Sequence, residues 1–276
     1  MIISKPINAD SRKVLEEILL SKSSIGNLEK EYIQKLLDFR YKIYEENTTS
    51  FTKISPCSLD ELYKKYILDL YDIKTVRLDG LRASIFESNP KKCLYCGIDK
   101  ASEIDHYLPK IIYPSFSINH LNLIPICTTC NKSKSNRIFD SGDNSRLFLN
   151  MYFDKINNFE LVRCNLIIND QNLLPCSQFI INNNLPENIL KVAINHITKL
   201  SLISKFNSAS SEKLSEFIVG YKNNPTSNIN IQKSLENHIN VKLELGINYW
   251  EYILYKQMNT EKFIDFVVNY SNMRSV

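Results

Sequence analysis

Four cysteines in the middle of the chain have the spacing of a metal site. Cys93 and Cys96 form one Cys-x-x-Cys pair, and Cys127 and Cys130 form a second pair after a gap of 30 residues. Each pair can provide two thiolates from one tight turn, and four thiolates make the tetrahedral site that suits zinc. The spacing predicts one structural zinc ion per chain. A redox role for either pair is disfavoured, because no βαβ pattern surrounds it.

The segment between the two pairs predicts a small ββα unit. The stretch Glu103–Lys110 begins with a pattern typical of a short strand, which ends at the dipeptide Asp105-His106. After a loop, residues Asn122–Ile126 are typical of a second strand. A short helix is expected to begin at Thr128. The polar side chains expected on this helix are Asn131, Lys132, Lys134 and Arg137.

These residue types suit the hydrolysis of a phosphodiester bond. A neutral imidazole can take a proton from water, which favours His106 as a general base. The carboxylate of Asp105 and the amide oxygen of Asn131 are ligands that suit Mg²⁺ or Mn²⁺ better than zinc. Neighbouring side chains of a strand point to opposite sides, so we expect Asp105 to face the metal and the helix, and His106 to face the phosphate.

The segment from residue 93 to residue 137 resembles the HNH endonuclease family, the ββα-metal nucleases. The matching positions are Asp105-His106, Asn122 and Asn131, and the two Cys-x-x-Cys pairs frame them. The third motif position holds Asn131 instead of His, a substitution that many HNH-type members share. The resemblance implies catalytic roles for His106, Asp105, Asn122 and Asn131, with His106 as the base. It further implies that Asp105 and Asn131 hold one Mg²⁺ or Mn²⁺ and that Asn122 fixes the backbone that orients His106.

Basic residues near this motif are candidates for holding the backbone of a nucleic acid. Simple solubilising charge is the alternative for each of them. The neighbouring apolar loop 111–117 is expected to pack against the helical body, with base stacking as the alternative. His120 falls outside the motif and is interpreted as a loop residue, with metal or substrate contact as the alternative. The candidate nucleic-acid contacts are Lys110, Lys132, Lys134 and Arg137.

Outside this segment, apolar residues recur mostly at helical spacing. A strand is expected within 159–168, followed by a turn at 169–172 and a second short strand. The prediction is a mainly α protein with a small embedded ββα unit, α+β overall. It comprises an N-terminal helical region (1–89), an HNH core (90–140) and a mostly helical C-terminal region (141–276) that packs on the core. The helices are expected at 10–22, from 27 to about 44, from a capping box at 58–61 through residue 70, and at 186–200, 210–221, 229–245, 247–257 and 260–271.

The composition is that of a globular protein. The 276 residues are 43% hydrophobic and 11% aromatic, which excludes intrinsic disorder, and the net charge of +4 permits nucleic-acid binding without requiring it. Without a long apolar run or a signal-peptide pattern, the chain is expected in the cytoplasm, away from membranes. There Cys57, Cys164 and Cys176 are expected to be reduced bystanders.

The predicted function is a metal-dependent HNH endonuclease that cuts DNA. Double-stranded DNA is the expected substrate rather than RNA. The Asp-His-Tyr-Leu-Pro-Lys stretch and the Tyr-Pro-x-Phe-Ser loop resemble nucleases of bacterial anti-phage systems. That resemblance implies a defence role beside a partner such as an ATPase or a sensor protein. The alternatives are a homing or restriction endonuclease and a non-catalytic zinc module that binds nucleic acid or protein. A binding module needs the four cysteines but not Asp105, His106 and Asn131 in register.

Overall fold

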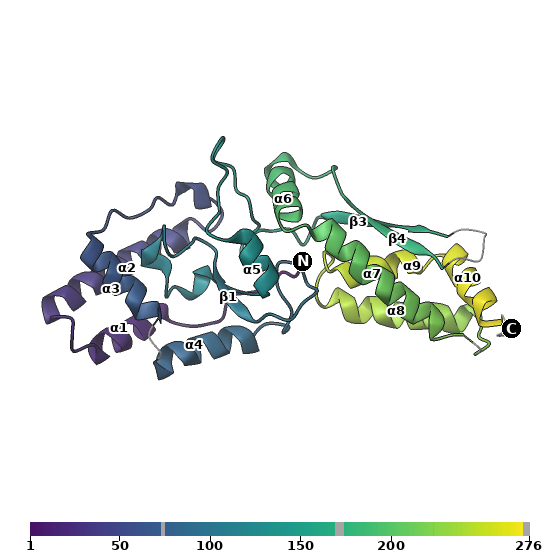
Figure 1. Cartoon of the computed structure of the whole chain (residues 1–276), viewed down its shortest axis with the longest axis horizontal. Coiled ribbons are helices and arrows are strands. Elements are labelled where there is room, and N and C mark those ends of the chain that lie inside the picture. The colour runs from purple at the N-terminus through teal and green to yellow at the C-terminus, as the bar shows by residue number, and fades with distance from the viewer. Residues whose placement is uncertain (73–74, 169–173, 223, 273–276) are drawn as a thin grey trace. The chain divides into compact units, whose positions relative to one another are not determined.

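The structure is a computed structural model that describes residues 1–72, 75–168, 174–222 and 224–272 (Figure 1). It divides into two compact units. The N-terminal unit comprises Ser4–Tyr95 and Asp99–Asp154, and the C-terminal unit comprises Met1–Ile3, Cys96–Ile98 and Lys155–Val276. The expected mainly helical architecture with small sheets is confirmed. The division into regions 1–89, 90–140 and 141–276 stays a prediction.

The N-terminal unit combines helices with one two-stranded sheet. Asp10 begins the first helix, because its carboxylate accepts hydrogen bonds from the backbone N–H groups of Arg12 and Lys13. The fourth helix was not predicted, since Gly80 and several charged residues interrupt its apolar pattern. The helices are α1 (Ser11–Ser21), α2 (Asn27–Glu46), α3 (Glu61–Asp72), α4 (Val76–Glu87) and α5 (Thr128–Lys134), and the strands are β1 (Glu103–His106) and β2 (Leu123–Ile126).

The predicted ββα arrangement is confirmed between β1 and α5. The two strands are antiparallel, with Asp105 opposite Ile124 and His106 opposite Leu123. Helix α5 follows β2 almost directly. It ends at Lys134, because the next residue, Ser135, has a positive φ of 53°. Arg137, which was expected on this helix, therefore lies beyond its end.

Aromatic side chains from separate segments form the core that surrounds the loop between the strands. The rings of Tyr44 on α2 and Phe116 in the loop lie 5.1 Å apart, and Phe51 contacts both Tyr44 and Tyr107. All four rings are buried. The guanidinium of Arg40 covers the ring of Phe116 at 5.0 Å. The expected packing of this loop against the helices is confirmed for its residues 113–117, whereas Ile111 and Ile112 are exposed.

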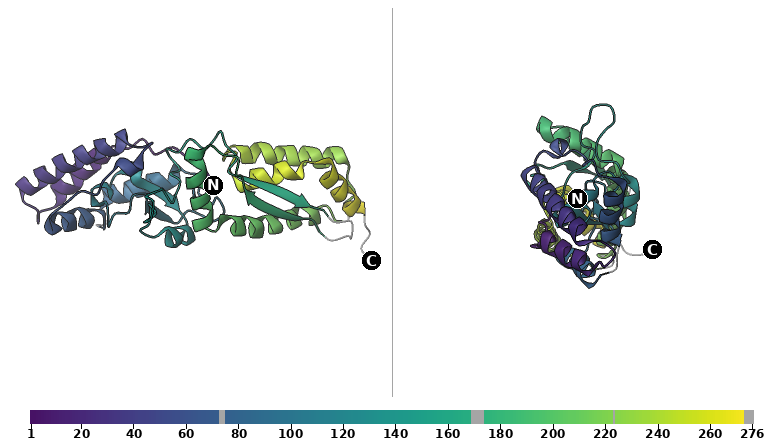
Figure 2. Two further views of the ribbon diagram at one scale, coloured as in Figure 1. Left: turned by 90° about the horizontal axis from the view of Figure 1, so that it is seen from above. Right: turned by 90° about the vertical axis from the view of Figure 1, so that its left-hand side faces the viewer.

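The C-terminal unit is a helical layer around a second antiparallel hairpin. Side chains of β3 (Val162–Ile167) and β4 (Cys176–Ile181) alternate between buried and exposed positions over most of their length. Figure 2 shows the hairpin between α7 (Leu202–Val219) and α9 (Trp250–Met258). The turn predicted at 169–172 lies outside the described residues. The other helices are α6 (Glu187–Lys199), α8 (Asn228–Leu243) and α10 (Glu261–Asn272).

The start of α7 and the polarity of the helices are two further features of the fold. Helix α7 begins at Leu202, eight residues before the predicted start, because buried Leu202 and Phe206 extend its apolar face toward the N-terminus. In the part of the chain that the structure describes, every helix is too short or too polar to cross a lipid bilayer.

Candidate active site and metal centre

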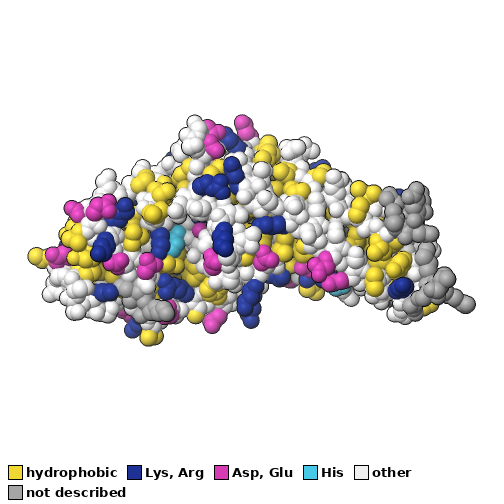
Figure 3. All heavy atoms as spheres, in the orientation of Figure 1, with side chains coloured by type: hydrophobic (Ala, Val, Ile, Leu, Met, Phe, Trp, Pro, Cys, Tyr) yellow, Lys and Arg dark blue, Asp and Glu magenta, His cyan; other side chains and the backbone are white. Residues whose placement is uncertain are grey.

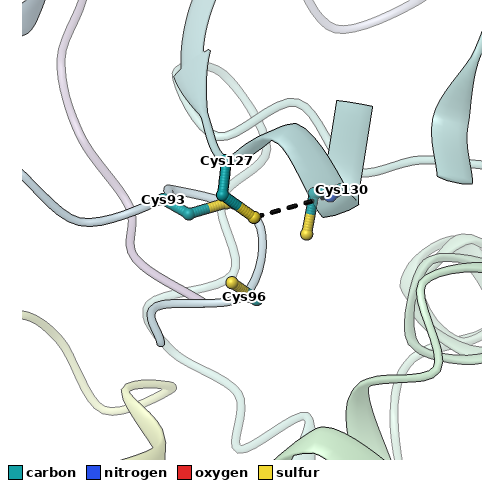
Figure 4. A group of neighbouring side chains, drawn as sticks. All are labelled: Cys93, Cys96, Cys127 and Cys130. Atoms are coloured by element: carbon teal, nitrogen blue, oxygen red, sulfur yellow. Dashed lines mark hydrogen bonds between the residues drawn. The ribbon is translucent and has the colours of Figure 1, made fainter. Parts of the chain in front are cut away.

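The four predicted zinc ligands come together in one buried group (Figure 4). The sulfur atoms of Cys93, Cys96, Cys127 and Cys130 all lie within 4.8 Å of one another. A tetrahedral zinc site with Zn–S bonds of about 2.3 Å places its sulfurs roughly 3.8 Å apart, so the group needs little adjustment to hold the ion. The backbone N–H of Cys130 points to the sulfur of Cys127 at 3.4 Å, which is the hydrogen bond drawn in Figure 4. This arrangement fits the structural zinc ion that the spacing predicts.

A cavity of about 380 Å³ lies beside the other end of α5. Its walls come from α3, from β1 with the loop that follows, and from α5 with the residues after it. Of the predicted catalytic residues, Asp105, His106 and Asn131 line this cavity. The structure therefore brings these three side chains to one place, as the sequence indicated.

His106 is held as a neutral base. Its Nε2 atom lies 3.0 Å from the carbonyl oxygen of Ser117. A carbonyl oxygen accepts hydrogen bonds and cannot donate them, so Nε2 carries the proton and Nδ1 is left as the acceptor. Burial lowers the pKa of His106 to about 3, although the hydrogen bond to Ser117 opposes this shift. The ring is therefore uncharged near neutral pH, with Nδ1 unprotonated.

Tyr71 on α3 fixes the other side of the His106 ring. The two rings meet edge to face with their centres 4.5 Å apart. The guanidinium of Arg82 and the ammonium of Lys110 lie 4.6 Å and 4.9 Å from the centre of the Tyr71 ring. This packing, together with the Ser117 carbonyl, restricts the rotation of His106.

Asn122 ties the loop after β1 to the segment before β2. Its Oδ1 accepts from the backbone N–H of Leu108 at 2.8 Å, and its Nδ2 donates to the carbonyl oxygens of Leu108 and Phe116. The Tyr44 hydroxyl also donates to Oδ1, at 3.2 Å. The side chain is fully buried. These bonds immobilise the backbone just after His106, which is the role that the resemblance implied for Asn122.

The carboxylate of Asp105 already has partners from the protein. Its Oδ1 accepts from the ammonium of Lys134 at 3.0 Å, and its Oδ2 accepts from the hydroxyl of Tyr95 at 3.1 Å. The Asp105 side chain is 5% exposed and the Lys134 side chain is fully buried. Each carboxylate oxygen has a second acceptor position, so Asp105 keeps the capacity to bind a cation.

Glu103 sets the orientation of the Asn131 amide. Nδ2 of Asn131 donates to Oε2 of Glu103 at 2.5 Å. Hydrogen bonds from Thr128 and Asn131 lower the pKa of Glu103, so this carboxylate is ionised and can only accept. The Asn131 nitrogen must therefore face Glu103, and Oδ1 is the atom left for a metal. With Asp105, this oxygen gives the hard donor set that suits Mg²⁺ or Mn²⁺.

The four predicted nucleic-acid contacts are placed differently from one another. Lys132 is exposed at the cavity, and Lys110 lines it while forming an ion pair with Asp72 at 2.6 Å. Arg137 is exposed, and its guanidinium binds the carbonyl oxygens of Ser133 and Lys134 at the end of α5. Lys134 departs from the expectation, because its ammonium is buried against Asp105 and does not reach the surface.

Three residues at the site were missed in the sequence. Glu103 could have been found, since it lies two positions before Asp105 on the same face of a strand. Tyr71 and Tyr95 approach the site from distant parts of the chain, and no local pattern marks them.

His120, interpreted as a loop residue, bonds through Nδ1 to the hydroxyl of Ser11 at 2.6 Å.

Comparisons with known proteins show which sequences this chain resembles. The family model described as HNH endonuclease matches residues 93–137. Protein ea31 of Escherichia phage lambda is 30% identical over 112 residues, which cover 40% of this chain and 36% of ea31. Septu protein PtuB of Bacillus thuringiensis is 37% identical over 59 residues, which cover 20% of this chain and 23% of PtuB. The chain thus spans about a third of one relative and a quarter of the other.

No solved structure matches the chain significantly. The family match covers the same residues that carry the cysteine group, the ββα unit and the cavity. Residues 93–137 therefore match the HNH endonuclease family model, and parts of the chain are similar in sequence to PtuB and ea31.

Proposed function

We propose that this protein is a metal-dependent endonuclease that hydrolyses phosphodiester bonds of DNA. Its preferred substrate is double-stranded DNA rather than RNA. The observation that carries the proposal is the shared cavity. A neutral imidazole from His106 and two oxygen donors, from Asp105 and Asn131, line the same space. That set is what metal-assisted hydrolysis of a phosphate ester requires.

In this proposal His106 activates the attacking water. Nδ1 accepts the proton of the water, while Nε2–H stays bonded to the carbonyl oxygen of Ser117 and stabilises the imidazolium that forms. Tyr71 and Asn122 keep the ring and its backbone in place. When bound by Asp105 and Asn131, Mg²⁺ or Mn²⁺ neutralises charge on the phosphate and stabilises the leaving oxygen.

Lys110, Lys132 and Arg137 are the proposed contacts to the nucleic-acid backbone. Lys110 and Lys132 lie at the cavity itself, where a phosphate group would enter. In Figure 3, Lys and Arg side chains on the visible face are interspersed with Asp and Glu side chains and do not form one large positive patch. A few local contacts of this kind position a backbone without reading its sequence.

A non-catalytic zinc module explains less of the site. Such a module accounts for the cysteine group but not for a carboxylate, an imidazole and an oriented amide around one cavity. Glu103 strengthens this argument, because it turns the Asn131 oxygen away from itself and leaves it available to a metal.

We further propose a role in anti-phage defence in the cytoplasm, with a partner such as an ATPase or a sensor protein. The similarity to Septu protein PtuB supports this role. The resemblance of the loop 113–117 and the stretch 105–110 to such nucleases points the same way. A homing or restriction function is the alternative.

The test is cleavage by the zinc-loaded protein in Mg²⁺. We expect supercoiled plasmid DNA to be cut, RNA to be cut more slowly, and Asp105→Ala and Asn131→Ala each to reduce the rate by at least about 100-fold. Zinc content and thermal unfolding serve as controls for the fold. Cleavage of RNA in preference to DNA would contradict the substrate, and wild-type rates for Asp105→Ala would contradict the site.

A further inference from the structure

The most unusual group near the cavity is the buried ammonium of Lys134, which contacts the cavity residue Asp105. Its side chain has no exposed surface, and its Nζ bonds to Oδ1 of Asp105 at 3.0 Å and to the carbonyl oxygen of His106 at 2.9 Å. A charged ammonium is rarely buried without a paired anion, because losing its hydration is costly. Asp105 provides that anion. The negative charge of Asp105, the charged ligand of the proposed site, is thus already neutralised from within the protein, and the nearby carboxylate of Glu103 is bonded to Asn131.

A second observation strengthens this point. The other oxygen of Asp105 accepts from the buried hydroxyl of Tyr95, so both oxygens are held by protein donors. Lys134 sits one turn after Asn131 on α5, and this spacing places the ammonium next to the two proposed metal ligands. A divalent cation bound there lies close to a fixed positive charge in a poorly hydrated place, where charge repulsion is strong.

We infer that Lys134 makes binding of the catalytic cation depend on the nucleic acid. With Lys134 paired to Asp105, and with the charge of Glu103 facing that of Lys132, adding a divalent cation leaves a net charge of about +2 at the site, which is unfavourable on its own. The phosphates of a bound nucleic acid offset that charge. The cation and the nucleic acid therefore bind cooperatively, and the cavity stays largely unloaded until a strand is present. This inference rests on the proposed cation site at Asp105 and Asn131.

The test measures Mn²⁺ binding directly. Free Mn²⁺ is titrated by electron paramagnetic resonance against zinc-loaded protein, without and with a DNA duplex, in the His106→Ala background so that the DNA stays intact. We expect weak Mn²⁺ binding without DNA and clearly tighter binding with it. By linkage, Mn²⁺ must raise the affinity for the duplex by the same factor. Equal Mn²⁺ affinity with and without DNA would overturn the inference.

Substitution of Lys134 isolates its share of this coupling. Lys134→Met and Lys134→Gln should tighten DNA-free Mn²⁺ binding on the order of 10- to 100-fold and reduce the gain caused by DNA by the same factor. Lys134→Gln keeps a hydrogen-bond donor for Asp105, which protects the fold if Lys134→Met is unstable. The matched control is Lys132→Met, measured without DNA. It removes an exposed charge at the same cavity and should change Mn²⁺ affinity far less.

Asp105→Asn separates the two levels of the argument. If Mn²⁺ binding requires Asp105 but is the same in wild type and in both Lys134 variants, the inference is wrong and the proposed cation site stands. If Mn²⁺ binding is unaffected by Asp105→Asn, alone or combined with Lys134→Met, the proposed cation site itself is wrong.

Discussion

The two ends of α5 contribute to two different sites, the cysteine group and the proposed cation site in the cavity. At its start, Cys127 and Cys130 join Cys93 and Cys96 in a group of four like ligands. One turn later, Asn131 lines a cavity and bonds to Glu103, while Lys134 is buried against Asp105, which lines the same cavity. The four thiolates of the first group serve to bind an ion. In the proposed function, the second must bind and release a proton, a cation and a phosphate.

This difference explains why the two sites differ in charge. Four thiolates around one zinc ion give a closed site with no free position, and binding of the ion stabilises the fold. In the cavity, Lys134 offsets Asp105, while Glu103 is used to orient an amide. A tight resident ion is favoured in the cysteine group, and a weak exchangeable one is favoured in the cavity.

The largest expected effect is the loss of the cysteine group. Cys96→Ser or Cys127→Ser removes one thiolate, so the protein should lose its single zinc ion and unfold at a much lower temperature, since a structural zinc ion contributes about 10 kcal/mol or more to folding. Metal analysis and thermal unfolding measure both effects. Cys57→Ser and Cys176→Ser are the matched controls and should change little, because neither sulfur is buried. An unchanged zinc content in Cys96→Ser would contradict the four-cysteine site.

Removal of the exchangeable cation should act on cleavage and spare the fold. Brief treatment with EDTA should stop cleavage before the buried zinc is lost, and Mg²⁺ should restore it, whereas excess Zn²⁺ should inhibit by competing in the cavity. Asn131→His adds an imidazole ligand and should raise activity with Ni²⁺, Co²⁺ or Zn²⁺ relative to Mg²⁺. Cleavage supported best by Zn²⁺, with indifference to Mg²⁺, would show that the ligand set is wrong.

A smaller effect is expected from Glu103. Glu103→Gln lets the Asn131 amide turn, because a glutamine can donate as well as accept, and the metal then meets an NH₂ group in part of the molecules. The rate of cleavage at limiting Mg²⁺ should fall by about 10- to 100-fold, as is usual when the support of a metal ligand is removed. Glu87→Gln, at an exposed position, is the control. A higher Mg²⁺ concentration should rescue part of the loss, and a loss that is insensitive to Mg²⁺ would argue for another role.

The smallest effect concerns acid stability. The unfolded chain binds a proton at His106 below a pKa of 6.5, but the buried ring does not until about pH 3. The free energy of unfolding should therefore decrease as the pH falls below 6.5, by roughly 1 kcal/mol per pH unit. His106→Asn should flatten this slope between about pH 6.5 and 5, before most carboxylates titrate. His120 and His238, whose pKa values are also lowered by burial, remain in both proteins. Equal slopes would contradict the buried neutral state of His106.

The comparison also shows what the sequence can and cannot reveal. The type and spacing of four cysteines predict the first site, which consists of Cys93, Cys96, Cys127 and Cys130. The strands and the helix of this segment follow from local patterns. The alternation that indicated β3 likewise located the second hairpin. These features depend on neighbours in the sequence.

Other features depend on tertiary packing and left no local signal. Lys134 looks like an exposed helix lysine, and only the fold reveals its position beneath Asp105. Tyr71 reaches His106 from α3, and Tyr44 reaches Asn122 from α2. The side chains proposed as catalytic were thus placed at one cavity by the motif, whereas the groups that hold and neutralise them were not predictable.

The most direct test of the central claim is cleavage by His106→Ala with and without imidazole. The zinc-loaded variant should cut plasmid DNA on the order of 10²- to 10⁴-fold more slowly than wild type in Mg²⁺ while keeping its zinc and its thermal stability. Free imidazole should enter the enlarged cavity and restore part of the rate, without restoring Asp105→Ala. Cleavage by His106→Ala at the wild-type rate would contradict the assignment of His106 as the base.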